Sequence, residues 1–139
     1  MNYMQKICKE KNIIDIINSK QDLLHSKGAT IDEIEKLAER TQVSFADEYV
    51  VYLKTFGIIA LDGHEFTGVS NSKRMNVADV TLEYKGIYHC KLDGLYVIED
   101  TDFDGIIMWQ SCDGKVYKTI GDSEPRLAYE SLSDYICAL

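Results

Sequence analysis

The sequence has little proline, little glycine and no long apolar run. One proline and nine glycines among 139 residues are too few for a collagen-like fibre or a disordered polymer. No window reaches the roughly 18 consecutive apolar residues that a membrane-spanning helix needs, and the start lacks an apolar segment followed by a secretory cleavage site. We therefore expect a soluble, cytoplasmic protein without membrane attachment.

Positive charge is also scarce. Lys and Arg total 15 against 23 Asp and Glu, so the formal net charge is −8. Proteins that bind nucleic-acid phosphates normally have the opposite sign, so we expect no nucleic-acid partner and favour a basic protein partner. The stretch from Leu92 to Gly114 has no Lys or Arg, and its acids are Asp93, Glu99, Asp100, Asp102, Asp104 and Asp113.

The four cysteines form no C-x-x-C pair. A cytosolic domain of this size needs no disulfide framework, so we expect free thiols at Cys8, Cys90, Cys112 and Cys137. The adjacent His89 and Cys90 do not have the spacing of zinc ligands, and a Cys nucleophile would need a nearby His that the sequence does not place. Neither a phosphate-binding glycine motif nor a G-x-S-x-G elbow occurs, so we expect no enzyme activity, cofactor or metal.

Helical periodicity marks both ends of the chain. Apolar residues between Met4 and Ile17 predict an amphipathic N-terminal helix. Thr30 and Glu33 have the spacing of a capping box and predict a second helix from Ile31 onward. A third helix is predicted from Ser44 to Phe56, with Asp47 at the capping position, and a closing helix from near Ser131.

Between these helices the pattern changes to short apolar runs. Strands are predicted over 95–98, 106–109 and 116–120, with a hairpin turn at Asp113-Gly114, and further strands over 66–69 and 77–81. The order predicts an α+β fold: an antiparallel sheet of short strands packed by N-terminal helices and a closing C-terminal helix. We expect a single domain over 1–139, with 1–27 as a helical extension and 28–139 as the core.

Aromatic residues accompany the predicted strands. Trp109 lies among apolar neighbours and is expected in the core. The tyrosines allow two interpretations, a place in the core or a place on an outer binding face, because alternation in a strand puts some of them outside. These tyrosines are Tyr84, Tyr88, Tyr96 and Tyr117.

In this order and spacing, the sequence resembles the SUKH superfamily, which contains bacterial immunity proteins and fungal Smi/Knr cell-wall synthesis regulators. The resemblance runs from about Thr30 to the C-terminus. It implies that a small acidic member binds and neutralises a cognate polymorphic toxin, often a nuclease. The alternative that it implies is an intracellular scaffold or regulator with a non-toxin partner. The segments that carry the resemblance are Ile31–Glu35, Ser44–Phe56, Gly57, Glu65–Val69, Asp93–Glu99, Asp113–Tyr117 and Ala128–Ile136.

The segment Asp100-Thr101-Asp102-Phe103-Asp104-Gly105 matches the first half of a calcium-binding loop. The twelfth position, which requires Glu, is Ser111, and the flanks are predicted strands rather than helices. We interpret the segment as an acidic turn, either merely solvated or a contact for a basic partner. The residues predicted to bind a protein partner are Asp62, Glu65, Asp100, Asp102, Asp104 and Asp113.

Overall fold

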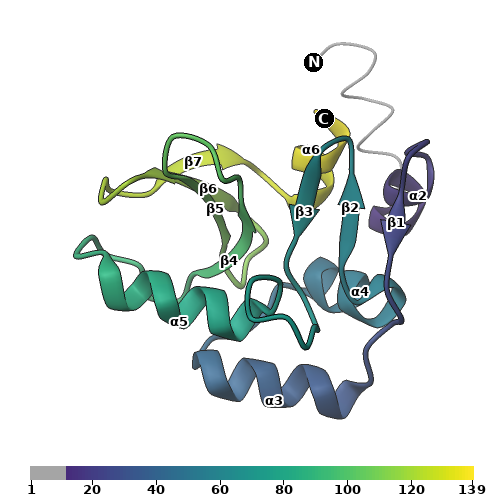
Figure 1. The fold of residues 1–139 in the computed structure, drawn as a ribbon, viewed down its shortest axis with the longest axis horizontal. Coiled ribbons are helices and arrows are strands. Elements are labelled where there is room, and N and C mark those ends of the chain that lie inside the picture. Colours follow the sequence, from purple (N-terminus) through teal and green to yellow (C-terminus); the bar gives the residue numbers. More distant parts are fainter. Residues whose placement is uncertain (1–11) are drawn as a thin grey trace.

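The fold is known from a computed structural model that describes residues 12–139. That part of the chain contains five helices and seven strands, and the strands form two antiparallel sheets (Figure 1). This arrangement confirms the predicted α+β class. The helices are α2 (Ile13–Asn18), α3 (Ile31–Thr41), α4 (Asp47–Phe56), α5 (Val77–Ile87) and α6 (Leu132–Cys137). The three-stranded sheet holds β1 (Leu24–His25), β2 (Ile59–Leu61) and β3 (His64–Phe66). The four-stranded sheet holds β4 (Tyr96–Asp100), β5 (Ile106–Gln110), β6 (Val116–Ile120) and β7 (Arg126–Tyr129).

Local capping signals place two helix starts as predicted. The Thr30 hydroxyl accepts from the Glu33 amide at 3.1 Å, and the Glu33 carboxylate accepts from the Thr30 amide at 3.0 Å. Ser131 accepts from the amide of Asp134 at 3.0 Å and begins α6. The part of the predicted N-terminal helix that precedes Asn12 lies outside the described residues.

Two local predictions are wrong. The segment predicted as a strand over 77–81 is the first half of α5, because the Asn76 side chain accepts from the amides of Ala78 and Asp79 and so starts a helix. Helix α4 begins at Asp47, and its preceding residue Ala46 offers no side-chain cap. The Ala46 amide instead donates to the Tyr96 hydroxyl at 3.0 Å, a tertiary contact that sequence spacing does not reveal.

The four-stranded sheet has an apolar cluster on each face. Tyr96 and Met108 belong to the larger cluster, which includes residues of α4 and α6. Ile107 and Trp109 alternate with them and belong to a second cluster, which includes Val80 of α5. Trp109 is fully buried, as predicted, and Tyr96 is also buried, whereas the other three tyrosines in question are half-buried.

The cysteines do not all behave as predicted. Cys90 and Cys112 are free thiols, but Cys137 is disulfide-bonded, so the expectation is wrong for that residue. Cys8 lies outside the described residues. Spacing along the chain does not reveal a disulfide, since its formation depends on which sulfur atoms meet in space.

Thr67 joins the two sheets just after β3. Its amide donates to the carbonyl of Ile98 at 2.9 Å, and its hydroxyl donates to the carbonyl of Val97 at 2.7 Å, both on β4. Its own carbonyl accepts from the hydroxyls of Tyr49 and Tyr52 at 3.2 and 2.7 Å. A buried network with every polar group satisfied fixes how the sheets sit against each other.

Next to this junction, two glycines bring backbone segments into close approach. A Cβ atom on Gly68 would lie 1.8 Å from the carbonyl oxygen of Gly57, which ends α4 with φ +73°. Gly68 also pairs with the segment before α5, because its amide donates to the Met75 carbonyl at 2.9 Å. Only glycine fits this crossing without backbone movement.

We predict that Gly68→Ala lowers the free energy of unfolding by about 1–3 kcal/mol, because the added methyl group overlaps a backbone carbonyl. Chemical denaturation followed by circular dichroism measures this loss. Gly86→Ala in α5 is the matched control, because its Cβ atom meets nothing within 4 Å, and it should leave stability unchanged or raise it slightly. Equal stability of the two variants would contradict the prediction.

Candidate protein-binding surfaces

The structure separates the predicted acids of the 92–114 stretch. Asp100 ends β4, and Asp102 and Asp104 lie in the β4–β5 turn. Asp113 lies in the β5–β6 turn, which is at the opposite end of the strands because successive hairpin turns alternate between the ends of an antiparallel sheet. The six predicted residues therefore do not form one surface.

Two of the predicted site acids in this stretch, Asp100 and Asp113, accept hydrogen bonds within the chain. The Asp100 carboxylate accepts hydrogen bonds from the Tyr84 hydroxyl and from the Asp102 amide. Burial, together with this carboxylate, raises the pKa of Tyr84. Asp113 accepts from the Ser111 hydroxyl and the Lys115 amide, and these bonds lower its pKa. The Asp100 and Asp113 carboxylates therefore stabilise the β4–β5 and β5–β6 turns, respectively.

The predicted acids of the β2–β3 hairpin are also placed apart. Asp62 is exposed in the turn with φ +48°, and its amide donates to Asp22 at 2.9 Å. Glu65 lies on β3, where its carboxylate forms an ion pair with Arg74 at 2.7 Å. Glu65 therefore has a cationic partner within the chain, whereas Asp62 lies in the exposed turn.

The β4–β5 turn presents an aromatic ring between two carboxylates. Phe103 is 66% exposed and lies between Asp102 and Asp104, and neither acid has an ion pair with a described residue. The two acids adopt φ of +54° and +53°, and Gly105 follows with φ +70°. Asp tolerates this left-handed region better than most residues, so the sequence suits the turn. We call residues 102–104 the acidic tip.

A second turn lies against the acidic tip. The Gly121 amide, at the start of the β6–β7 turn, donates to the Gly105 carbonyl at 3.0 Å. Ile120 precedes this turn and is 54% exposed. The end of the four-stranded sheet therefore combines apolar side chains with the acids of the tip.

A buried acid cluster lies between the sheets and was not predicted. Glu99 is 2% exposed, and its carboxylate accepts from the Tyr135 hydroxyl and pairs with Nδ1 of His64 at 2.6 Å. Burial and this carboxylate raise the pKa of Tyr135. His64 and Tyr135 are separated from Glu99 by 35 and 36 positions along the chain. No local sequence pattern links residues so far apart, so only the fold brings these three side chains together.

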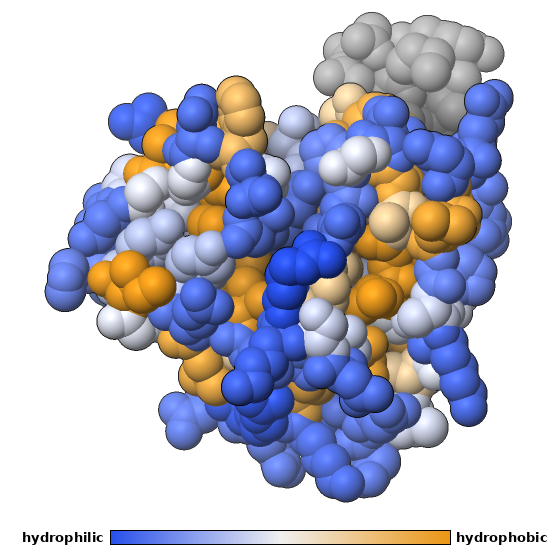
Figure 2. Space-filling view, in the orientation of Figure 1, coloured by the Kyte–Doolittle hydropathy of each residue, from blue (hydrophilic) through white to orange (hydrophobic). Residues whose placement is uncertain are grey.

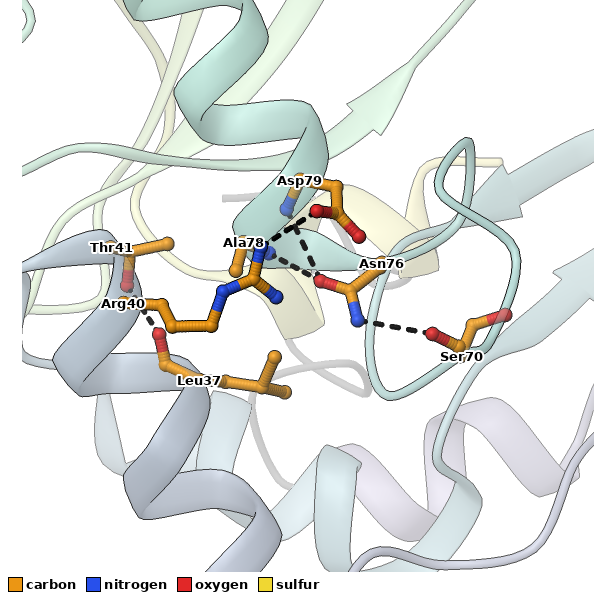
Figure 3. A network of polar contacts seen from close by, with 7 residues as sticks. All are labelled: Leu37, Arg40, Thr41, Ser70, Asn76, Ala78 and Asp79. Atoms are coloured by element: carbon orange, nitrogen blue, oxygen red, sulfur yellow. Dashed lines mark hydrogen bonds and ion pairs between the residues drawn. The ribbon is translucent and has the colours of Figure 1, made fainter.

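A groove lies between α3 and the loop over 69–76, and we call it the α3 groove. Its volume is about 620 Å³, with Leu37, Ile58 and Val69 as its apolar lining. Figure 3 shows Arg40 reaching from α3 to Asp79 on α5, and Asn76 bridging the start of α5 to the carbonyl of Ser70. The remaining lining residues are Ser26, Glu33, Lys36, Arg40, Ser70, Asn71, Ser72 and Asn76.

The cations at the α3 groove are paired within the chain. Lys36 lies 3.3 Å from Asp32, and Arg40 lies 2.7 Å from Asp79. Figure 2 shows the face that carries α3 as largely hydrophilic, with apolar atoms exposed between polar ones. Because both cations already have carboxylate partners and Glu33 adds a further acid, nothing in the lining of the α3 groove favours an anionic ligand.

A smaller groove lies against the four-stranded sheet and α6, and we call it the sheet groove. It has a volume of about 340 Å³. Tyr135 lines the sheet groove and also belongs to the buried Glu99 cluster, so the groove borders the seam between the sheets. The other lining residues are Thr101, Ile106, Met108, Lys118, Ala128 and Tyr129.

Residues 12–139 contain no group of three or more His, Cys, Asp or Glu side chains arranged to hold a metal ion. In the segment resembling a calcium loop, the Asp100 carboxylate is used by Tyr84 and the Asp102 amide. No helix of this part of the chain is long and apolar enough to cross a membrane.

We predict that Tyr135→Phe lowers the free energy of unfolding by about 1–3 kcal/mol, because the buried Glu99 carboxylate loses one of its donors. Urea denaturation measures the change. Tyr117→Phe is the control, since the half-buried Tyr117 hydroxyl makes no hydrogen bond with a described residue, and we expect its effect to stay within about 0.5 kcal/mol. A loss of equal size in both variants would contradict a specific role for the Tyr135 hydroxyl.

Comparison with known protein families agrees with the resemblance noted in the sequence. A family model called SUKH_6 and described as SMI1-KNR4 cell-wall matches residues 31–136, which is more than three quarters of the chain. The match begins at the first residue of α3 and ends within α6, so it covers the four-stranded sheet, strands β2 and β3 of the other sheet, and α3 to α6 up to residue 136. The chain therefore belongs to the SUKH (SMI1-KNR4) family.

Proposed function

We propose that this chain is an immunity protein that binds and neutralises a cognate toxin in the cytoplasm, without catalysing a reaction. Membership in the SUKH family supports an immunity-type or a Smi/Knr-type role. The acidic tip is the observation that carries the choice of surface: Phe103 is 66% exposed between Asp102 and Asp104. A partner therefore meets, on one turn, an aromatic side chain and two carboxylates that form no ion pair with a described residue.

Charge supports a basic partner. The chain has a net charge of −8, and toxins that act on nucleic acid need basic surfaces to hold phosphates. A negative surface accelerates encounter with such a domain and competes with its polyanionic substrate. The free carboxylates of Asp102 and Asp104 bring this field to the contact point.

Phe103 supplies the apolar part of the contact. Large aromatic side chains are frequent hot spots of protein interfaces, because they bury much area with few rotatable bonds. Asp102 and Asp104 on both sides of Phe103 adopt left-handed backbone, and a ring presented on an already formed turn loses little conformational entropy on binding.

The alternative function is that of an intracellular scaffold or regulator of the Smi/Knr type with a non-toxin partner. Co-expression of the product of the adjacent gene distinguishes the two functions. If that product kills the host and this protein restores growth, the immunity function is supported. If the product is harmless, or kills equally with and without this protein, the immunity function is wrong and the alternative is favoured.

We predict that Asp102→Asn together with Asp104→Asn slows association with the toxin about 3- to 10-fold at low salt, and that the difference shrinks at high salt. Asn removes both charges and keeps the preference for left-handed backbone. Stopped-flow measurements at several salt concentrations test this. The matched control is Glu35→Gln together with Glu39→Gln, which removes two exposed charges from α3. Equal slowing by both pairs would show that only net charge matters.

We predict that Phe103→Ala weakens toxin binding by at least about 30-fold, mainly through faster dissociation, as expected for an aromatic hot spot. Surface plasmon resonance measures both rates. Leu24→Ala is the control, because Leu24 is 71% exposed on the other sheet. Unchanged dissociation of the Phe103 variant would exclude the acidic tip from the interface.

A further inference from the structure

We propose that the sheet groove receives a short apolar segment of the partner and that a carboxylate in this segment pairs with Lys118 and Arg126. The proposal rests on the proposed function for the identity of the partner. It adds a second contact with the opposite charge preference to that of the acidic tip.

The lining of the sheet groove suits an apolar chain segment. Ile106 and Met108 project from β5, and Tyr129 and Tyr135 project from β7 and α6. Ile120 is 54% exposed and pairs with Ile106 across the strands, so it extends the same apolar face beyond the groove. A volume of about 340 Å³ is near the lower limit of ligand sites, which fits a few residues rather than a large molecule.

One cation lines this groove, Lys118, and a second, Arg126, lies opposite it on the neighbouring strand. Lys118 on β6 is paired in register with Arg126 on β7, so both side chains project from the same face of the sheet. Like charges at directly opposed positions destabilise a sheet. Neither side chain forms an ion pair or hydrogen bond with a described residue. An external carboxylate between them would remove the repulsion.

The α3 groove provides the contrast. Its cations Lys36 and Arg40 have carboxylates of this chain at 3.3 and 2.7 Å. Lys118 lines the sheet groove without such a partner in the described part of the chain, although the chain has eight more acidic than basic residues. Charge complementarity therefore assigns the anionic ligand to the sheet groove rather than to the larger α3 groove.

The sheet groove is continuous with the acidic tip. Thr101 lines the groove and directly precedes Asp102 in the β4–β5 turn. One partner surface can therefore contact both, with basic residues around the tip and an acidic residue within an apolar segment at the groove. Opposite charges at adjacent positions fix the register of docking, because a reversed orientation places like charges together.

The test uses three blocked peptides as probes: acetyl-Leu-Glu-Leu-amide and its Gln and Lys counterparts. Amide chemical shifts of the full-length, ¹⁵N-labelled protein are followed during titration with each peptide. We expect the Glu peptide to bind in the millimolar range, at least about fivefold more tightly than the Gln peptide, and the Lys peptide more weakly still. The largest shifts should be at Ile106, Lys118, Ala128 and Tyr129. Equal binding of the three peptides, no binding, or shifts confined to other regions would overturn the proposal.

Two variants separate recognition from folding. Lys118→Gln and Arg126→Gln should each abolish the preference for the Glu peptide, with a melting temperature equal to or above that of the unmodified protein, because the like-charge contact is relieved. Lys73→Gln, at an exposed cation near the α3 groove, should keep the preference. If the Lys118 and Arg126 variants also keep it, the proposal is wrong.

The peptide titration and the co-expression experiment test the two proposals separately. A Glu preference without rescue of growth would leave the sheet groove as an anion-selective site and contradict only the immunity function. Rescue of growth without a Glu preference would support the immunity function and overturn the assignment of the sheet groove.

Discussion

The structure depends on the buried contact between Thr67 and β4. This residue links its amide and hydroxyl to the carbonyls of Ile98 and Val97, and its carbonyl receives the hydroxyls of Tyr49 and Tyr52. All of these groups are buried and have partners. Because hydrogen bonds are directional, they fix the position of one sheet against the other more precisely than apolar contact alone. The Glu99 cluster and the sheet groove both border this seam, and their shapes depend on it.

The acids of this chain show that net charge alone does not locate a binding surface. Glu99 is buried between the sheets, Asp100 holds its own turn, and Glu65 is paired with Arg74. Only acids such as Asp102 and Asp104, which are exposed and unpaired, direct their full charge toward a partner. The distinction follows from solvation and pairing: a carboxylate that accepts hydrogen bonds or an ion pair inside the chain has less interaction left for another molecule.

The same reasoning applies to the cations and distinguishes the two grooves. In the α3 groove the positive side chains are matched by Asp32 and Asp79. At the sheet groove, Lys118 and its cross-strand neighbour Arg126 have no such match among residues 12–139. The smaller groove is therefore the more selective one, because an unpaired charge beside apolar walls discriminates strongly between ligands of different charge.

The sequence by itself determined the local features: the Thr30–Glu33 cap, the start of α6 at Ser131, the central strands β4, β5 and β6, and the family resemblance. These depend on side chains within a few residues of one another. The two-residue strand β1 needs β2 as its partner, and 77–81 was misread as a strand because its β-branched residues obscured the Asn76 cap. Only tertiary structure decided that His64 meets Glu99, that Lys118 faces Arg126 and that Asp113 lies far from the acidic tip, because chain reversal and strand register set which distant residues become neighbours.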